Sequence, residues 1–247
     1  MRRLLLAVLA LGATFQSTPR PLAAQSDTTA HPTFRIVPRR PVEQLRAEAL
    51  TLALPPGLGG TRAADLAELV ALEPTIRLDI RYASTNNFMG AAMYSQARAF
   101  LQRPAAEAVV RAHRALAREG YGLLIHDAYR PWYVTWMFWE ATPDSQRIFV
   151  ANPATGSRHN RGAAVDLTLY DLRTGRPVRM PSGYDEFSER AYAEYPGGTP
   201  PERARRALLR RYMEAEGFTV NPTEWWHFDY NGWRAYGVLN TPFERLR

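Results

Sequence analysis

Two histidines of this chain stand near carboxylates at spacings that suit a metal site. His159 precedes Asp166 by seven residues with Gly162 between them, so an imidazole on a loop can meet a carboxylate on the next strand. His227, on another expected strand, could complete a set of three ligands. Two imidazoles, one carboxylate and an open fourth position are typical of a catalytic zinc ion, which acidifies bound water and polarises a carbonyl group. The pattern favours one Zn²⁺ per chain.

Such a site also needs a general base, and Glu224 is the candidate because it precedes His227 by three residues. Residues three apart in a regular strand point to opposite faces of a sheet. Glu224 and His227 can therefore share a site only if Glu224 lies in the turn before the strand, or if a β-bulge intervenes. The preceding Asn221-Pro222-Thr223 favours the turn.

Each of these residues also has an ordinary interpretation. A histidine is most often a surface residue or a hydrogen-bonded structural one, and we expect this of His31, His113 and His126. Asp166 favours the metal, because an acid on an otherwise apolar strand is costly unless it is paired or metal-bound. Arg130 could be a surface ion-pair residue, or a fixed cation for an oxyanion or a substrate carboxylate.

The composition excludes several other kinds of chemistry. The 247 residues are 46% hydrophobic and 22% charged, which suits one or two globular domains with a real core. There is no cysteine, and all 31 basic residues are arginine. Thiol nucleophiles, disulfides, Schiff-base lysines and P-loop lysines are therefore excluded. Catalysis must use histidine, carboxylates, hydroxyls, arginine or a metal held by nitrogen and oxygen.

Residues 1–24 have the pattern of a secretory signal peptide. Basic residues are followed by an apolar run from Leu4 to about Leu11 and then by small residues up to Ala24, after which we expect cleavage. The run is shorter than the roughly 20 residues that span a membrane, so we expect no stable membrane insertion. A lipoprotein is excluded because no cysteine follows the cleavage point. We expect the mature protein to be periplasmic or secreted.

The positive charge does not by itself indicate a nucleic-acid partner. Residues 1–24 carry three arginines and no acid, so their removal lowers the formal net charge from +7 to +4. No basic stripe interleaved with aromatic residues is visible, and the excess charge is sufficiently explained by solubility. We expect a small-molecule substrate and no nucleic acid.

The candidate residues must be positioned by a mixture of helices and strands. Apolar periodicity, helix caps and turn residues predict the following elements: helices over 42–52, 63–72, 104–120, 132–139 and 201–216, and strands over 78–82, 121–126, 164–170 and from about 225. The strands do not alternate regularly with helices, which predicts an α+β domain with a central, mostly antiparallel sheet flanked by helices. We expect residues 25–61 to be a flexible extension with one short helix, and residues 62–247 to form the catalytic domain.

Several ordered segments resemble one family. The segment Ser157-x-His159-x-x-Gly162-x-Ala164-Val165-Asp166 and the segment Glu224-Trp225-Trp226-His227 are similar to those of the zinc D-alanyl-D-alanine dipeptidases of the VanX type, relatives of the DD-carboxypeptidases. Further matching stretches are Arg81-Tyr82-Ala83, Asn87-Phe88, 127–131, 180–188 and Gly217-Phe218. The resemblance covers about 66–230 and implies a compact domain with a central antiparallel sheet.

The resemblance also implies roles for individual residues. His159, Asp166 and His227 would hold zinc. Glu224 would activate water and later protonate the leaving amine, and Arg130 would stabilise the tetrahedral oxyanion. Ser157 and Asp185 would hold the substrate ammonium, although Asp185 could instead cap a helix over 187–192.

Three functions remain to be distinguished. The first is hydrolysis of D-Ala-D-Ala to two D-Ala in the cell envelope, during peptidoglycan turnover. The second is a DD- or LD-carboxypeptidase that trims longer peptidoglycan stem peptides. The third is a non-catalytic wall-binding module, against which the presence of Glu224 argues, because a structural metal site needs no base. The dipeptidases of vancomycin-resistance clusters lack the signal peptide and the extension, which favours turnover over resistance.

Overall fold

The computed structural model describes residues 31–246, and the expected signal peptide lies outside these described residues. The helices are α1 (Val42–Ala49), α2 (Leu69–Leu72), α3 (Arg103–Ala117), α4 (Trp132–Ala141) and α5 (Pro200–Ala215). The strands are β1 (Leu66–Glu68), β2 (Arg77–Leu78), β3 (Phe100–Gln102), β4 (Tyr121–Asp127), β5 (Ala164–Asp171), β6 (Phe218–Asn221) and β7 (Glu224–Tyr230). Short 3₁₀ turns include η1 (Arg81–Ala83), η2 (Asp144–Phe149), η3 (His159–Arg161), η4 (Glu189–Ala191), η5 (Trp233–Ala235) and η6 (Phe243–Arg245).

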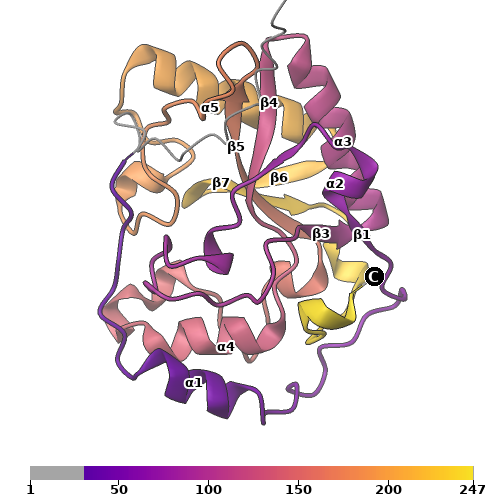
Figure 1. Cartoon of the computed structure of the whole chain (residues 1–247), viewed down its shortest axis with the longest axis vertical. Coiled ribbons are helices and arrows are strands. Elements are labelled where there is room, and N and C mark those ends of the chain that lie inside the picture. The colour runs from indigo at the N-terminus through magenta and orange to yellow at the C-terminus, as the bar shows by residue number, and fades with distance from the viewer. Residues whose placement is uncertain (1–30, 247) are drawn as a thin grey trace, which may run out of the picture.

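A five-stranded sheet forms the centre of the molecule (Figure 1). Its strand order is β2-β4-β5-β7-β6, and every neighbouring pair except β2 and β4 is antiparallel. The strands β1 and β3 form a separate antiparallel pair. The predicted α+β domain with a mostly antiparallel sheet is confirmed.

The register of the sheet places three acidic or basic side chains in one row. Asp127 at the end of β4 lies opposite Asp166 on β5, and Asp166 lies opposite His227 on β7. The row depends on a bulge, because the β4 register shifts between Ile125 and Asp127 and leaves His126 as the extra residue. Directly opposed residues share a face of the sheet, so the row is a built-in feature of the strand pairing.

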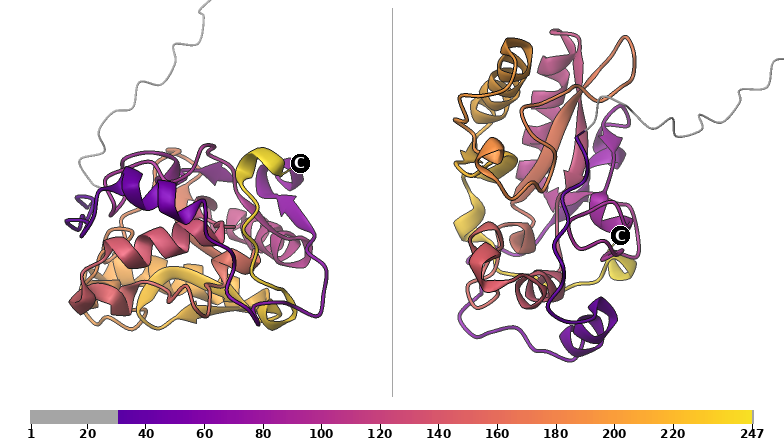
Figure 2. Two further views of the ribbon diagram at one scale, coloured as in Figure 1. Left: turned by 90° about the horizontal axis from the view of Figure 1, so that it is seen from below. Right: turned by 90° about the vertical axis from the view of Figure 1, so that its left-hand side faces the viewer.

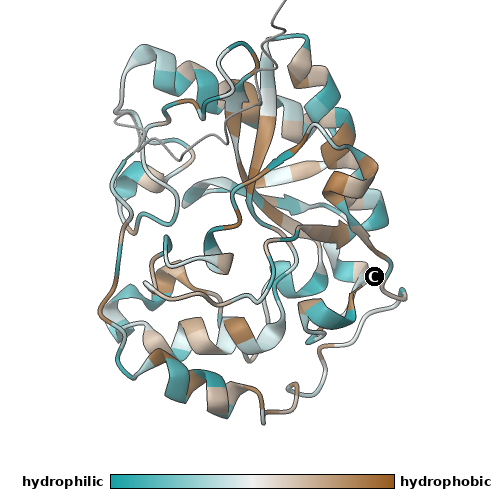
Figure 3. Cartoon of the chain, in the orientation of Figure 1, coloured by the Kyte–Doolittle hydropathy of each residue, from teal (hydrophilic) through white to brown (hydrophobic). Residues whose placement is uncertain are grey.

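Helices cover the sheet on one side and extend the molecule below it. The helices α3 and α5 pack against each other, with α3 on β4 and α5 on β6 (Figures 1 and 2). The helices α1 and α4 lie side by side at the other end of the molecule. Apolar residues run along β4 and β5 in Figure 3, as expected for strands that are buried on both faces. Among residues 31–246, none of the helices is long and apolar enough to cross a membrane.

The predicted elements agree best where a long apolar pattern is bounded by capping residues. The helices α1, α3, α4 and α5 and the strands β4, β5 and β7 are confirmed. The N-terminus of α5 has a capping box between Thr199 and Glu202. The predicted helix over 63–72 was wrong in its first half, which contains β1. The predicted strand over 78–82 is a strand only at Leu78, the end of β2, and its last two residues belong to the turn η1. The strand β6 was not predicted.

The N-terminal segment lies along the rest of the domain from residue 31 onwards. The Ile36 amide donates to the Phe88 carbonyl over 3.0 Å, and the Arg39 amide donates to the Ala141 carbonyl over 2.9 Å. Leu45 and Ala49 on α1 are fully buried. These residues pack against the domain, which the sequence did not indicate. The division of the chain at residue 61 stays a prediction.

A buried histidine ties α3 to the sheet. The Nδ1 atom of His113 accepts a hydrogen bond of 3.0 Å from the Leu123 amide on β4, and its Nε2 atom lies 2.9 Å from the Thr75 hydroxyl oxygen. Only the neutral ring has a nitrogen that can accept. Burial lowers the pKa of His113, and the charges of Glu73 and Arg114 act in opposite directions on it.

We predict that His113 makes the stability of the fold depend on pH. Below the ordinary histidine pKa of about 6.5 the unfolded chain binds a proton that folded His113 does not, so the free energy of unfolding falls as the pH falls. The His113→Asn variant lacks this contribution. Urea unfolding at pH 7.5 and 5.5 should show a stability gap between wild type and variant that is smaller at pH 5.5. A gap that is the same at both pH values would contradict the prediction.

Candidate metal centre and its cleft

Three buried side chains bring one ligand atom each to a common point. The Nε2 atom of His159, the Nδ1 atom of His227 and the Oδ1 atom of Asp166 form a triangle. Its sides are 2.9 Å from His227 to Asp166, 3.1 Å between the two imidazoles and 3.3 Å from His159 to Asp166. Ligands at about 2.0–2.1 Å from a tetrahedral zinc ion are about 3.3 Å apart. The triangle therefore has the size that a metal ion requires.

Hydrogen bonds on the outer side of both imidazoles place a ring N–H group there and turn the other nitrogen of each ring towards the common point. The Nδ1–H group of His159 donates to the Ala128 carbonyl over 2.6 Å, and the Nε2–H group of His227 donates to Asp229 over 3.0 Å. A carbonyl can only accept, so the facing ring nitrogen must carry the proton. Partners of this kind are usual behind metal-bound histidines, because they fix both the tautomer and the ring orientation.

The Asp166 carboxylate is held from one side and left open on the other. Its Oδ2 atom accepts a hydrogen bond of 2.9 Å from the Tyr184 hydroxyl, whereas Oδ1 is buried without any hydrogen-bond partner in residues 31–246. Burial keeps the pKa of Tyr184 well above its usual range, so the hydroxyl remains a donor. A buried oxygen aimed at two imidazole nitrogens fits a metal ligand.

The surroundings of His227 also favour positive charge at this point. Burial lowers the pKa of His227, but Asp166 and Asp229 outweigh burial and raise it well above its usual range. A cation placed among these groups would be stabilised by the same carboxylates. The electrostatics and the distances thus agree that these residues can hold a metal ion.

Glu224 reaches the same centre because the pairing of β6 with β7 is irregular. The register between β6 and β7 shifts after Val220, so that Asn221 lies opposite Glu224 across the Pro222-Thr223 turn. The Oε2 atom of Glu224 lies 3.7 Å from His227 Nδ1 and accepts a hydrogen bond of 2.8 Å from the Asn221 amide group. Burial, opposed by the charge of His227, raises the pKa of Glu224. Glu224 is the first residue of β7 and does not lie in the turn, so the favoured turn placement was wrong and the alternative, an irregularity in the strand pairing, is what lets Glu224 and His227 share a site.

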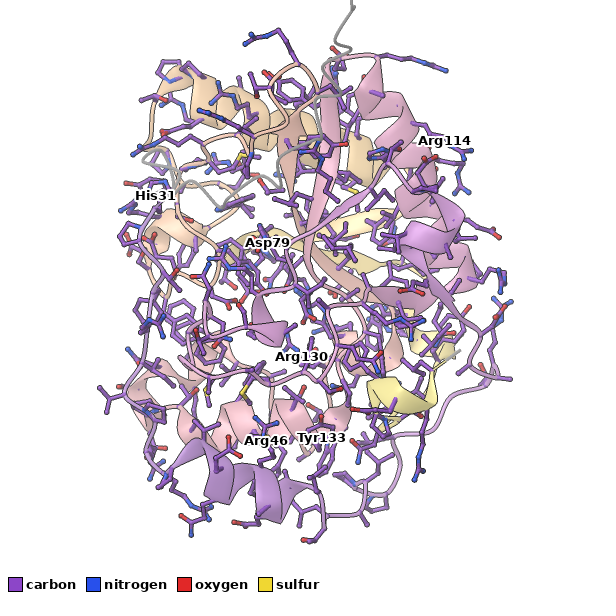
Figure 4. All side chains as sticks on the ribbon, viewed as in Figure 1. His31, Arg46, Asp79, Arg114, Arg130 and Tyr133 are labelled. Atoms are coloured by element: carbon purple, nitrogen blue, oxygen red, sulfur yellow. The ribbon has the colours of Figure 1, made fainter. Side chains whose placement is uncertain are left out.

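Arg130 is a buried, rigidly held cation and not a surface ion-pair residue. Its Nε and Nη2 atoms both donate to Asp127 Oδ2, over 3.0 and 2.7 Å, and Asp127 is fully buried. The guanidinium also lies against the rings of Tyr82 and Phe138, at 5.2 and 4.9 Å from their centres. Figure 4 shows Arg130 between the central strands and α4. Within residues 31–246 no hydrogen bond involves its Nη1 atom, which is available to a ligand.

All seven candidate residues line or border one cleft of about 270 Å³. His159, Asp166, His227, Glu224, Arg130, Ser157 and Asp185 are among its walls, together with apolar side chains such as Phe88, Phe138, Phe149 and Phe187. The Ser157 hydroxyl accepts a hydrogen bond of 3.2 Å from the His159 amide, so it also shapes the loop that carries this ligand. The cleft is small, and its volume suits a small molecule such as a short peptide better than a long polymer.

Asp185 faces this cleft with too few partners for a buried acid. It is 7% exposed, and its carboxylate accepts a hydrogen bond of 2.8 Å from the Tyr82 hydroxyl. Burial and the charge of Asp166 raise the pKa of Asp185 well above its usual range. It does not cap a helix, because Ser188 caps the turn η4. A cationic group in the cleft would give this carboxylate an oppositely charged partner.

The sequence of the chain is similar to one family of known proteins. The family model described as D-ala-D-ala dipeptidase matches residues 62–244 of the chain. The D-alanyl-D-alanine dipeptidase of Escherichia coli (strain K12) is 36% identical over 179 residues, which are 72% of this chain and 91% of that protein.

The chain belongs to this dipeptidase family.

A second relative of the family is the D-alanyl-D-alanine dipeptidase of Enterococcus faecium, which is 35% identical over 62% of this chain and 85% of that protein. The solved structure of the LdcB LD-carboxypeptidase is similar over 55% of this chain and 61% of that chain, with 21% identity and a TM-score of 0.36. At this TM-score, the likeness to LdcB has no bearing on what this dipeptidase family member does.

Several residues that complete the site of this dipeptidase family member were not assigned a role from the sequence. They are Tyr82, Asp127, Tyr184 and Asp229. Asp229 could have been found, because it lies two residues after His227 and therefore on the same face of β7. Tyr82 donates to Asp185, and Tyr184 on the loop after β5 donates to Asp166. No local spacing in the sequence indicates these contacts.

We predict that Tyr184 strengthens metal binding by holding Asp166. The His227→Ala variant should lose metal binding, whereas Tyr184→Phe should weaken it about 10- to 100-fold, the usual cost of removing a partner behind a metal ligand. His113→Asn is the matched control, since it replaces a buried imidazole on α3 that lies outside the triangle. Competition with a chromogenic chelator measures each affinity. Wild-type affinity in Tyr184→Phe would show that its hydrogen bond does not position the ligand.

Proposed function

We propose that this protein is a zinc-dependent dipeptidase that hydrolyses D-Ala-D-Ala to two D-Ala. The observation that carries the proposal is the composition of the cleft, in which a metal-ligand triangle and a carboxylate base face a second buried carboxylate within about 270 Å³. Membership of the dipeptidase family and the names of the relatives support the substrate. A small cleft that holds two carboxylates besides the metal-ligand triangle suits a short peptide with a free ammonium.

The proposed metal is Zn²⁺, one ion per chain, held by His159, Asp166 and His227. Two imidazoles and one carboxylate are a ligand set that zinc uses in catalytic sites. Once bound, zinc supplies a Lewis acid that acidifies water and polarises a carbonyl group. The open side of the triangle faces the cleft, where Glu224 and Arg130 lie.

Glu224 and Arg130 perform complementary tasks in the proposed reaction. Glu224 takes a proton from the attacking water and later gives it to the amine that leaves when the peptide bond breaks. Its raised pKa makes both transfers easier, because a base works best when its pKa approaches the working pH. Arg130 donates from its free Nη1 atom to the oxyanion, and its ion pair with Asp127 holds the guanidinium in a fixed orientation.

Asp185 and Ser157 are proposed to bind the substrate's free ammonium. Within residues 31–246, Tyr82 is the one hydrogen-bond donor to the Asp185 carboxylate, which lies in the same cleft as the metal-ligand triangle. An ammonium bound there would place the scissile bond of a dipeptide, and not that of a longer stem peptide, beside the base. The proposed partner is therefore a small molecule and not a nucleic acid.

We also propose that the enzyme acts in the cell envelope, during peptidoglycan turnover. The support is the basic, apolar and small-residue pattern of residues 1–24, which is typical of an export signal.

We predict that Glu224→Gln keeps zinc but loses hydrolysis of D-Ala-D-Ala. The amide has nearly the shape of the carboxylate but cannot accept the water proton, and general acid–base help typically contributes about 10²- to 10⁴-fold. Zinc content by atomic absorption and release of D-Ala should be measured on the same preparation. Near-normal turnover by the zinc-loaded variant would mean that another group is the base, and absence of turnover in the wild type would overturn the proposed function.

We predict that Asp185→Asn loses most activity on D-Ala-D-Ala but little on an N-acylated analogue. Asparagine tolerates the left-handed backbone of Asp185, with φ at 57°, so the loop can keep its shape. Removing one partner of a desolvated charge pair costs about 2–5 kcal/mol, which is a large change in kcat/KM. Equal losses on both substrates would contradict a role in ammonium binding and would favour the carboxypeptidase that trims longer stem peptides.

A further inference from the structure

Four phenylalanines from four separate segments meet beside the cleft. Phe187 lies 4.8 Å from Phe34, 4.8 Å from Phe149 and 5.3 Å from Phe88, measured between ring centres. We call these four residues the Phe187 cluster. Phe88, Phe149 and Phe187 line the cleft, whereas Phe34 supports Phe187 from behind. One wall of the substrate cleft therefore depends on a residue from the N-terminal segment.

The segment 31–39 joins two loops that are far apart in sequence. On one side it contacts the loop after η1, through Thr33 with Asn86 and through the Ile36 amide with the Phe88 carbonyl. On the other side, the Nε2–H group of His31 donates to the Met180 carbonyl over 2.8 Å. Figures 1 and 2 show this indigo segment descending along one side of the molecule to α1, next to the loop that follows β5. His31 is labelled at its upper end in Figure 4.

One hydrogen bond connects the loop 180–188 to the turn η1, which directly precedes the other joined loop. Tyr82 belongs to η1, and Asp185 belongs to the loop 180–188, in which Phe187 is also located. No strand or helix contains Asp185, and its backbone is in the left-handed region. Its position therefore depends on how the loop 180–188 packs on either side of it. Tyr184 contacts the rings of Tyr82 and Trp226, and Phe187 belongs to the Phe187 cluster.

We infer that the segment 31–39, through Phe34, positions Asp185 and thereby sets the affinity of the enzyme for substrates with a free ammonium. The segment holds the loop 180–188 against the loop after η1, so that the carboxylate of Asp185 and the hydroxyl of Tyr82 face the cleft at a fixed separation. Displacements of about 1 Å far from the reacting atoms can lower catalytic efficiency up to about 100-fold. The inference rests on the proposed function only in naming the ammonium as the group that Asp185 binds.

The test compares Phe34→Ala with a control in the same segment. Val37 is 86% exposed, so Val37→Ala shortens a side chain of the segment without touching the Phe187 cluster. For Phe34→Ala we expect kcat/KM on D-Ala-D-Ala to fall about tenfold, mainly through a higher KM, while zinc content stays at the wild-type level. Val37→Ala should match the wild type. Assays are run well below the unfolding temperature of each variant, and Phe34→Leu, which keeps most of the apolar volume, should recover most of the loss.

A second measurement does not depend on activity. Hydrogen exchange of the backbone amides in 180–188 should become several-fold faster in Phe34→Ala than in Val37→Ala, because the loop loses its packing partner. If Phe34→Ala changes neither KM nor the exchange rates, the inference is overturned. It is also overturned if Val37→Ala changes kcat/KM and KM as much as Phe34→Ala does. If the wild type does not hydrolyse D-Ala-D-Ala, the proposed function fails, and the exchange experiment alone decides whether Phe34 holds the loop.

Discussion

A carboxylate buried in the middle of a sheet must be compensated, and Asp166 imposes this requirement on the rest of the structure. It is 3% exposed and lies on β5, between two other strands. The compensation comes from three different places: His159 on the loop before β5, His227 on β7 and Tyr184 on the loop after β5. Each of these contacts fixes one segment relative to the sheet, so satisfying one charge also assembles the cleft.

The charges around the cleft are balanced only in part by the protein itself. Asp127 and Arg130 neutralise each other as a buried ion pair. Asp166, Asp185 and Glu224 then remain. Burial raises the pKa values of Asp185 and Glu224, and the charge of Asp166 adds to this effect. A divalent metal ion and one ammonium group would together offset three negative charges. The proposed metal ion and substrate ammonium would therefore match the cleft in charge.

Local patterns were enough to predict the parts of this structure that are held by local interactions. The helices α3 and α5 have a proline near the first turn, an apolar stripe and a glycine soon after the last turn, and both were predicted closely. The candidate metal ligands were noticed because histidines at suitable spacings accompany an acid on an apolar strand, and the structure brings the three side chains together. The short β1 and η1 were mistaken for other elements, since two or three residues carry no periodicity and are determined by their neighbours. The tyrosine partners of Asp166 and Asp185, Tyr184 and Tyr82, could not be predicted, because they meet these acids only when the loops pack.

The row formed by Asp127, Asp166 and His227 also determines where this chain can change in length. Side chains alternate between the faces of a strand, so adding or removing one residue within β4, β5 or β7 would turn a member of the row to the opposite face. At the other end of the same strands, the exposed turn 172–175 joins β5 to the segment that follows and contacts none of the row. Family members should therefore differ in length more often at that turn than within β4, β5 or β7.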